Sequence, residues 1–466
     1  MPLGPALQRR ATERDALINR AVIMHLGGLA NDDAHAMINE HAATDERARM
    51  NLDAGEKTRT VRHPAAERFP MQGGELTVGG VPLSLLAARV GRTPFYAYDR
   101  SLLRARVEEL RAVLPPAISL HYAMKANPMP AVVGFMAGLV DGLDVASGAE
   151  LLVALDAGMD PHDISFAGPG KSEVELAQAV AAGILLNVES EREVGLLADI
   201  AARLGRPARV AVRVNPDYEL KSSGMKMGGG PKQFGIDAER VPAVLAEIGR
   251  AGLAFEGFHI FSGSQNLRAE AICDAQTKGL DLATRLAAHA PSAVTTVNLG
   301  GGFGIPYFPG EQPLDLPTIG AHLHGIVESA KSKLPGAELV IELGRFLVGE
   351  AGIYAVRVVD RKVSRGEVFL VTDGGLHHHL SASGNFGQVI RKNYPVEIGT
   401  RATDSPREVA SVVGPLCTPL DLLADRMELA VAQPGDLAVV FQSGAYGLTA
   451  SPKQFLSHPA AVEVLV

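Results

Sequence analysis

The stretch His121-Tyr-Ala-Met-Lys-Ala-Asn-Pro128 decides the fold of this chain. The apolar run Ile118 to Met124 predicts a buried strand, and Asn127-Pro128 predicts the turn that ends it. Lys125 stands at the end of this strand, where apolar neighbours would disfavour its charged form and free an amine nucleophile. A lysine that reaches from the strand end into water is the alternative. A nucleophilic amine at this place could form a Schiff base with an aldehyde cofactor.

The sequence around this stretch alternates between strand-like apolar runs and amphipathic helical runs. Eight runs have the length and composition of buried strands: 119–124, 142–145, 163–166, 185–188, 209–214, 254–260, 295–299 and 338–341. Eight such strands with helices between them predict an α/β fold, a (β/α)₈ barrel of the TIM type. The active groups of such a barrel lie at the C-terminal ends of its strands.

The rest of the chain predicts further parts. Residues 1–70 are rich in Ala, Arg, Asp and Glu and predict a helical or partly disordered N-terminal extension. Strand-like pieces over 71–100 are expected to join a second domain. The barrel is predicted over 101–345. Over 346–466 the helical rhythm gives way to β-rich segments with Gly and Pro turns, which predict a mostly β C-terminal domain.

The composition predicts a soluble, globular protein. Its 466 residues are 47% hydrophobic and 21% charged. A net charge of -8 disfavours binding to nucleic acid or to anionic membranes, and no apolar stretch is long enough to span a bilayer. The two cysteines, Cys273 and Cys417, lie far apart in sequence, which disfavours a zinc site or a disulfide framework. These features predict a cytoplasmic protein.

Asp144 ends the second predicted strand, in Gly142-Leu-Asp-Val-Ala-Ser147. Its carboxylate could orient Lys125. The alternative is a helix cap, because Ser147 and Glu150 follow in the spacing of a capping box.

Two further motifs end the last two predicted strands. Consecutive glycines in Gly300-Gly-Gly-Phe-Gly304 could converge backbone N–H groups on a phosphate, or form a tight turn. Ile305 occupies the place of the last glycine of a dinucleotide fingerprint, which disfavours a dinucleotide. Glu342 and Arg345 could hold a pyridine nitrogen and a phosphate, or form a structural ion pair.

The predicted β domain carries two more candidates. Gly414-Pro-Leu-Cys-Thr-Pro-Leu-Asp421 offers a thiol and a carboxylate, although a lone cysteine is more often a small buried residue. His377-His-His379 resembles a metal cluster, but adjacent residues on a strand point to opposite faces. We therefore predict no metal.

Together these motifs resemble the fold type III pyridoxal-phosphate-dependent decarboxylases, the family of diaminopimelate, ornithine and arginine decarboxylases. The resemblance covers about residues 75–466. It implies a barrel that binds pyridoxal 5'-phosphate, a C-terminal β domain, and a homodimer with active sites at the interface. Lys125 would form the Schiff base, Asp144 would be the acid near it, and Glu342 would be the pyridinium partner.

The resemblance also assigns phosphate and partner-subunit roles. The positions that match phosphate contacts are Ser264, Gly300, Gly301, Gly302, Arg345 and Tyr446. Cys417 and Asp421 match a segment supplied by the partner subunit. In the family, that thiol is the proton donor after carbon dioxide leaves.

Departures from the family pattern concern the substrate and the ring. Phe261 stands where a histidine stacks on the cofactor, and Asn298 where an Asp often precedes the glycines. Thr418 replaces the carboxylate that pairs with the distal ammonium of the substrate. Ser381 and Asn385 replace an Arg and a Tyr that help to bind diaminopimelate. Because the loss of a buried charge partner costs several kcal/mol, we do not expect diaminopimelate, lysine or ornithine as the substrate.

The runs around Phe261 and Cys417 are most similar to two branches of the family. One is found with exosortase A and exopolysaccharide systems, and the other decarboxylates glutamate on an acyl carrier protein in aminoglycoside biosynthesis. The sequence therefore predicts α-decarboxylation of an amino acid, free, masked or carrier-linked, in exopolysaccharide or secondary-metabolite biosynthesis. The alternatives are diaminopimelate decarboxylase proper, an amino-acid racemase, or a catalytically silent binding protein.

Overall fold

The computed structural model describes residues 63–218, 225–226, 228–386, 388 and 391–466. Most of the predicted extension 1–70 lies outside these residues. Its described end contains the short helix α3 (Pro64–Glu67). No helix in the described part of the chain is both long enough and apolar enough to cross a bilayer.

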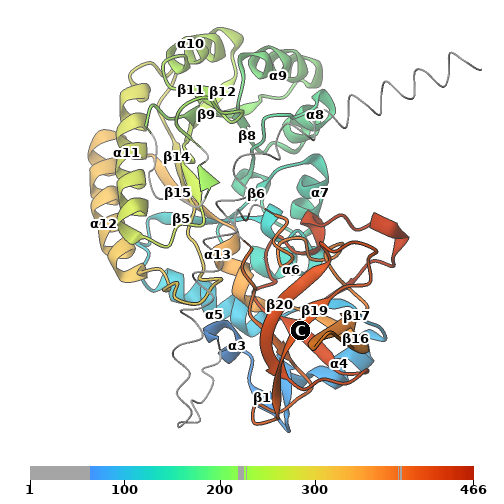
Figure 1. Ribbon diagram of the computed structural model, residues 1–466. Helices are drawn as coiled ribbons and strands as arrows, with labels where there is room; N and C mark the ends of the chain where they lie inside the picture. The colour runs from blue at the N-terminus through green and yellow to red at the C-terminus, as the bar shows by residue number, and fades with distance from the viewer. Residues whose placement is uncertain (1–62, 219–224, 227, 387, 389–390) are drawn as a thin grey trace, which may run out of the picture. The chain divides into compact units, whose positions relative to one another are not determined.

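Eight parallel strands close into the predicted barrel (Figure 1). They are β5 (Ile118–Ala123), β6 (Gly142–Val145), β7 (Ile164–Phe166), β8 (Leu185–Val188), β9 (Arg209–Asn215), β12 (Ala254–His259), β14 (Thr296–Gly301) and β15 (Glu338–Leu343). Each strand pairs with the next along the chain, and pairing of β15 with β5 closes the ring. A short strand, β11 (Ile236–Asp237), adds to the edge of β9.

Helices follow the strands and cover the outside of the barrel. They are α5 (Arg100–Arg111), α6 (Pro130–Ala137), α7 (Gly148–Asp156), α8 (Glu173–Ala182), α9 (Glu191–Leu204), α10 (Val241–Ala251), α11 (Ala269–Ala287), α12 (Leu316–Lys333) and α13 (Arg345–Val348). In α9 the buried positions Val194, Leu197 and Ile200 follow the helical period and face the core. Gly205, in the left-handed conformation, ends this helix.

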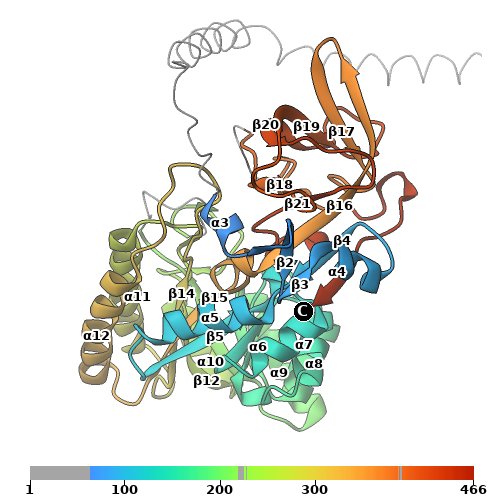
Figure 2. The same ribbon diagram turned by 90° about the horizontal axis from the view of Figure 1, so that it is seen from below.

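A second sheet contains the C-terminal strands. In order across the sheet they are β18 (Val396–Ile398), β21 (Leu437–Val440), β16 (Gly352–Ser364), β17 (Glu367–Thr372), β19 (Arg407–Val413) and β20 (Leu422–Ala430). Two strands extend it beside β16, namely β4 (Phe95–Tyr98) and β22 (Val462–Leu465). Segments from both ends of the described chain therefore meet in one sheet, as Figure 2 shows.

The other strands of the predicted 71–100 region form a separate small sheet. It consists of β1 (Met71–Gln72), β2 (Glu75–Val78) and β3 (Val81–Pro82), followed by helix α4 (Leu83–Val90). The backbone N–H of Leu76 donates to the carbonyl of Gly399, which ties this sheet to the C-terminal strands.

Two hydrogen bonds hold a loop of the second sheet against the mouth of the barrel. The backbone N–H of Tyr446 donates to the carbonyl of Ala126 at 2.8 Å, and Asn127 donates its Nδ2 to the carbonyl of Gly444 at 3.0 Å. Ala126 and Asn127 directly follow Lys125. The position of Lys125 thus depends on both parts of the fold.

Gly257 and Gly195 provide a matched pair for testing the barrel packing. A Cβ at Gly257 would lie 1.7 Å from the backbone oxygen of Thr296, whereas a Cβ at Gly195 in α9 would meet nothing within 4 Å. We expect Gly257→Ala to lower the free energy of unfolding by about 2 kcal/mol or more. Gly195→Ala should raise it by about 0.5–1 kcal/mol. Denaturant unfolding measures both, and equal effects would contradict the close approach of β12 and β14.

Candidate active site

Lys125 lies at the C-terminal end of β5, in the short helix η1 (Met124–Ala126). Its side chain is exposed within this chain, so the expectation that apolar neighbours would bury it is wrong. The ammonium group lies 5.8 Å from the centre of the Phe261 ring. The amine is accessible to a molecule that enters the barrel mouth.

Glu342 lies near the end of β15 and is buried beside two donors. Its Oε2 is 3.0 Å from Nε2 of His259 and accepts a hydrogen bond from Nδ2 of Asn298 at 3.1 Å. Burial alone would raise the pKa of Glu342, but the pKa is lowered well below its usual value by His259 and then by the charges of Lys125 and Arg213. Glu342 is therefore ionised, and among the described residues no hydrogen bond falls on its Oε1.

The glycines Gly300 to Gly302 form a turn that no other residue could make. Gly300 and Gly302 have φ angles of 67° and 74°. A Cβ would lie 2.7 Å from the Phe261 ring at Gly300, 2.2 Å from the Glu342 carbonyl at Gly301, and 2.1 Å from the Gly263 carbonyl at Gly302. The turn therefore packs directly against Gly263 and Ser264, which form the short strand β13.

Arg345 follows β15 at the start of α13 and is held by two tyrosines. It donates from Nη1 to the Tyr307 hydroxyl at 2.7 Å, and its guanidinium lies 4.6 Å from the centre of the Tyr446 ring. The predicted phosphate residues Arg345 and Tyr446 are thus in contact. Tyr307 was not predicted, and its only sequence signal is its place three residues after Gly304.

Asp144 contacts His121 and Ser165 instead of Lys125. Its Oδ1 is 3.3 Å from Nδ1 of His121 and accepts a hydrogen bond from the Ser165 hydroxyl. Burial lowers the pKa of His121, but the Asp144 carboxylate raises it above its usual value. The helix cap expected from the sequence is present, because Ser147 caps α7 by accepting from the N–H of Glu150.

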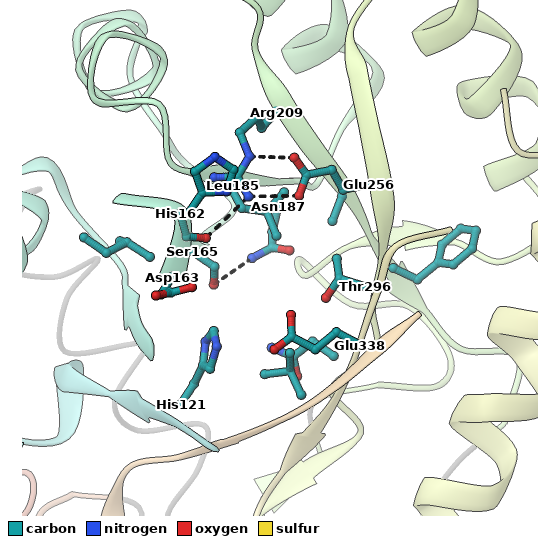
Figure 3. Close-up of a pocket in the computed structure, with 15 residues that line it drawn as sticks. His121, His162, Asp163, Ser165, Leu185, Asn187, Arg209, Glu256, Thr296 and Glu338 are labelled. Atoms are coloured by element: carbon teal, nitrogen blue, oxygen red, sulfur yellow. Dashed lines mark hydrogen bonds and ion pairs between the residues drawn. The ribbon is translucent and has the colours of Figure 1, made fainter. Parts of the chain in front are cut away.

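A small polar cavity lies at the opposite end of the barrel from Lys125 (Figure 3). Leu185, Arg209, Thr296 and Glu338, the first residues of their strands, line it. Arg209 pairs across it with Glu256, with Nε 2.5 Å from Oε1. Active groups of barrels lie at the C-terminal strand ends, so this cavity is not the candidate active site.

The Cys417 to Asp421 segment is not joined to the barrel mouth within one chain. The Cys417 thiol is exposed. The Asp421 carboxylate is buried and accepts from the N–H groups of Leu376 at 2.6 Å and Leu416 at 2.8 Å. In the described residues no hydrogen bond links this segment to Lys125, Glu342 or Arg345. Within this chain Asp421 therefore shapes a loop, which differs from its predicted role in substrate binding.

Two more predicted substrate residues lie in the second domain. Ser381 donates its hydroxyl to the carbonyl of Tyr446 at 2.9 Å, which places it beside the phosphate residues. The Thr418 hydroxyl is 3.3 Å from the N–H of Leu420, which donates to it. Neither residue carries a charge that could pair with an ammonium group.

The three consecutive histidines are buried in a turn, so the expectation that they lie on a strand is wrong. His378 is 3.2 Å from the Tyr354 hydroxyl, and His379 is 2.9 Å from the Ser443 hydroxyl. Both ring nitrogens of His377 are buried without a hydrogen-bond partner. Among the described residues, no group of three or more His, Cys, Asp or Glu side chains is arranged to hold a metal ion.

The barrel mouth fits the cofactor that the sequence predicts. A Cβ-free turn at Gly300 to Gly302 and the adjacent Arg345 suit a phosphate. Oε1 of the ionised Glu342 can accept a hydrogen bond from a protonated ring nitrogen. Phe261 offers an aromatic face to the ring, and Lys125 offers an amine. These residues would hold pyridoxal phosphate.

Comparison with known proteins gives the same family. Residues 100–349 match the family model of the pyridoxal-binding domain of pyridoxal-dependent decarboxylases. The chain is 39% identical to the L-glutamyl-[BtrI acyl-carrier protein] decarboxylase of Niallia circulans, over 80% of this chain and 88% of that protein. It is 34% identical to the diaminopimelate decarboxylase of Aquifex aeolicus, over 84% and 91%.

A solved structure also matches. The Helicobacter pylori diaminopimelate decarboxylase complexed with L-lysine superposes with a TM-score of 0.73 at 27% identity, over 82% of this chain and 94% of that chain. The fold predicted from the sequence, a TIM-type barrel with a separate mostly β domain, is confirmed.

The buried histidines predict acid lability. Burial lowers the pKa of His377 to about 3 and that of His378 to about 4. Because these values lie below the unfolded value near 6.5, the unfolded chain binds more protons as the pH falls. We expect the free energy of unfolding to decrease from about pH 6.5 downward. His377→Phe should reduce this slope, measured by urea unfolding at several pH values, and an unchanged slope would contradict the role of His377.

Proposed function

Because this chain belongs to the pyridoxal-dependent decarboxylases and is an amino-acid decarboxylase that uses pyridoxal phosphate, we propose that its substrate carries a masked side-chain carboxylate. The mask would be a thioester to a carrier protein or an amide. The observation that supports this proposal is the neutral character of Thr418 and Ser381, the positions that the family resemblance assigns to the distal end of the substrate.

The residues of the barrel mouth suit decarboxylation. Bound pyridoxal phosphate supplies an aldehyde for the amino group of the substrate and a ring that accepts the electron pair left by carbon dioxide. Lys125 would hold the cofactor through its amine and yield it to the substrate. Glu342 would keep a proton on the ring nitrogen, and Arg345 would bind the phosphate. The bond from Cα to the carboxylate breaks, and a proton takes its place.

Charge complementarity supports a masked substrate. A free diamino acid would bring an ammonium group to a site where Thr418 and Ser381 offer only hydroxyl groups. An ammonium group left unpaired on binding costs several kcal/mol. A thioester or amide carries no charge and loses little on entering such a site. The Niallia circulans relative acts on a glutamyl group attached to an acyl carrier protein, which agrees with this argument.

We also propose that the active site is completed in a homodimer. Cys417 is exposed and belongs to a segment that makes no hydrogen bond with the barrel mouth in the described residues. Nearby Leu420 and Phe386 expose 59% and 43% of their surface, which suits an interface around this segment. Cys417 of a second copy would then return the proton to Cα. A cytoplasmic location and the exosortase-associated branch stay predictions.

A carbon-dioxide-release screen tests the substrate. With pyridoxal phosphate present, we expect turnover of carrier-linked or amide-masked glutamate. For diaminopimelate, lysine and ornithine, kcat/KM should be lower by about a hundredfold or more, because the distal ammonium finds no partner. Thr418→Glu supplies the missing carboxylate and should shift the ratio of kcat/KM values toward the diamino acids. Thr418→Ser, which stays neutral, is its control.

The outcomes of this screen separate the alternatives. Efficient turnover of free diaminopimelate without turnover of masked amino acids would establish a diaminopimelate decarboxylase instead. Inversion at Cα without carbon dioxide release would indicate a racemase. A chain that binds the cofactor but changes no substrate would be a silent binding protein.

Lys125→Ala tests the assignment of the amine. Because the Lys125 side chain is exposed, the variant should still fold, which thermal unfolding checks. It should lose the visible absorbance of lysine-bound pyridoxal phosphate and all carbon dioxide release. Lys392→Ala, a change in the second domain, should keep both. Retention of the absorbance in Lys125→Ala would show that another lysine holds the cofactor.

A further inference from the structure

Asn298 connects two parts of the barrel mouth through its amide. Its Nδ2 donates to Oε2 of Glu342 at 3.1 Å, while its Oδ1 accepts from the backbone N–H of Gly300 at 2.7 Å. Asn298 is buried, with 8% of its surface exposed. Both ends of the amide are therefore used. The amide orientation is fixed, since only its nitrogen can donate to a carboxylate.

The strand register places Asn298 beside the other donor to Glu342. Asn298 on β14 pairs with His259 on β12 and with Val340 on β15, two residues before Glu342. His259 and Asn298 thus reach the same carboxylate oxygen from neighbouring strands. Four titratable or charged groups interact electrostatically with Glu342. They are His259 from β12, Lys125 from η1, Arg213 from β9 and His121 from β5. Asn298 is the neutral donor among them.

The second hydrogen bond of Asn298 holds the glycine turn. Gly300 adopts a φ angle of 67°, and a Cβ there would lie 2.7 Å from the Phe261 ring. A shift of the Gly300 N–H would therefore move the turn against Phe261. The same side chain that faces Glu342 thus sets the start of the phosphate turn and its distance from the aromatic ring.

We propose that Asn298 is a positioning residue that orients the Glu342 carboxylate toward the cofactor nitrogen while it fixes the first amide of the phosphate turn. This inference rests on the proposed function, because it concerns the same cofactor site. Asn298 touches neither the reacting atoms nor the substrate. It acts through Glu342 and Gly300.

If a carboxyl group replaced the Asn298 amide, its interaction with Glu342 would depend on pH. Two carboxylates that face one another at hydrogen-bond distance cannot both ionise readily, so the pair retains one proton with a raised pKa. While that proton is present, the introduced acid donates to Glu342 as the amide does. Once it is lost, the carboxylates repel one another. The amide is therefore replaceable by an acid only below the raised pKa.

Asn298→Asp tests this role by the affinity of the apo-protein for pyridoxal phosphate from pH 6 to pH 9, measured without substrate. At pH 6 we expect an affinity within about threefold of the wild type. Above the pKa of the shared proton, the ratio of variant to wild-type affinity should fall about tenfold per pH unit, because binding then requires uptake of one proton. Asn298→Ala should weaken binding at every pH.

Two further variants separate this role from general damage. In the double variant Asn298→Asp with Glu342→Gln, no proton is shared between two carboxylates. The decrease in the ratio of affinities at high pH should therefore disappear. Thr296 lies on the same strand, and its side chain forms no hydrogen bond with the described residues, so Thr296→Val should keep the wild-type pH profile. If Asn298→Asp unfolds at high pH, thermal unfolding of the apo-protein serves as the readout. The stability of Asn298→Asp must then rise as the pH is lowered, whereas the stability of the double variant must show no such rise.

The outcomes distinguish this inference from the proposed function. Two results would overturn the role of Asn298. One is a ratio of variant to wild-type affinity that does not change with pH in Asn298→Asp, and the other is a ratio that still falls at high pH in the double variant. If the affinity ratio of Asn298→Asp falls at high pH but the wild-type enzyme releases carbon dioxide from no masked amino acid, the role of Asn298 is supported and the proposed substrate is overturned. A wild-type chain that binds no pyridoxal phosphate overturns both.

Discussion

The ionised Glu342 carboxylate in the barrel interior is the constraint on which the candidate site depends. A buried carboxylate is costly unless donors and positive charges surround it. Here His259, Asn298, Lys125 and Arg213 provide them from four different segments. These segments can converge only when the ring of strands is closed. The fold and the charge state of one side chain are therefore linked.

The barrel was predictable because its strands are buried on both faces. Most of these strands then contain a short apolar run such as Leu339 to Ile341, which the sequence displays directly. The second sheet was less predictable. In β20 the buried residues form one pair near each end, and charged residues such as Asp425 and Glu428 interrupt the run between them, so that strand does not stand out. Pairing of β4 with β22 joins segments more than 360 residues apart, and no local pattern reports such a contact.

The site was predictable where chemistry coincides with strand ends. Lys125, Glu342 and the glycines of 300–302 lie at or just beyond the C-terminal ends of their strands, and the strand-end rule finds them. The exposure of Lys125 matches the alternative of a lysine that reaches into water, and the apolar sequence neighbourhood alone could not decide between the two. Tyr307 and His259 were missed as partners of Arg345 and Glu342 for a related reason. Their roles arise from contacts between distant segments, and the residue type alone does not reveal them.

The cofactor residues form a complete group within one chain, whereas the predicted substrate residues do not. The cofactor residues converge within a single chain, since the strand ends of the barrel present most of them and a loop of the second sheet adds Tyr446. The substrate residues do not converge in this way: Asp421 is used to hold the Leu376 and Leu416 loops together, and Cys417 remains exposed. The two hydrogen bonds to the buried Asp421 carboxylate order the Cys417 segment before any partner binds. In the proposed homodimer, a second copy would complete this surface, and the neutral Thr418 would then select against a substrate with a free distal charge.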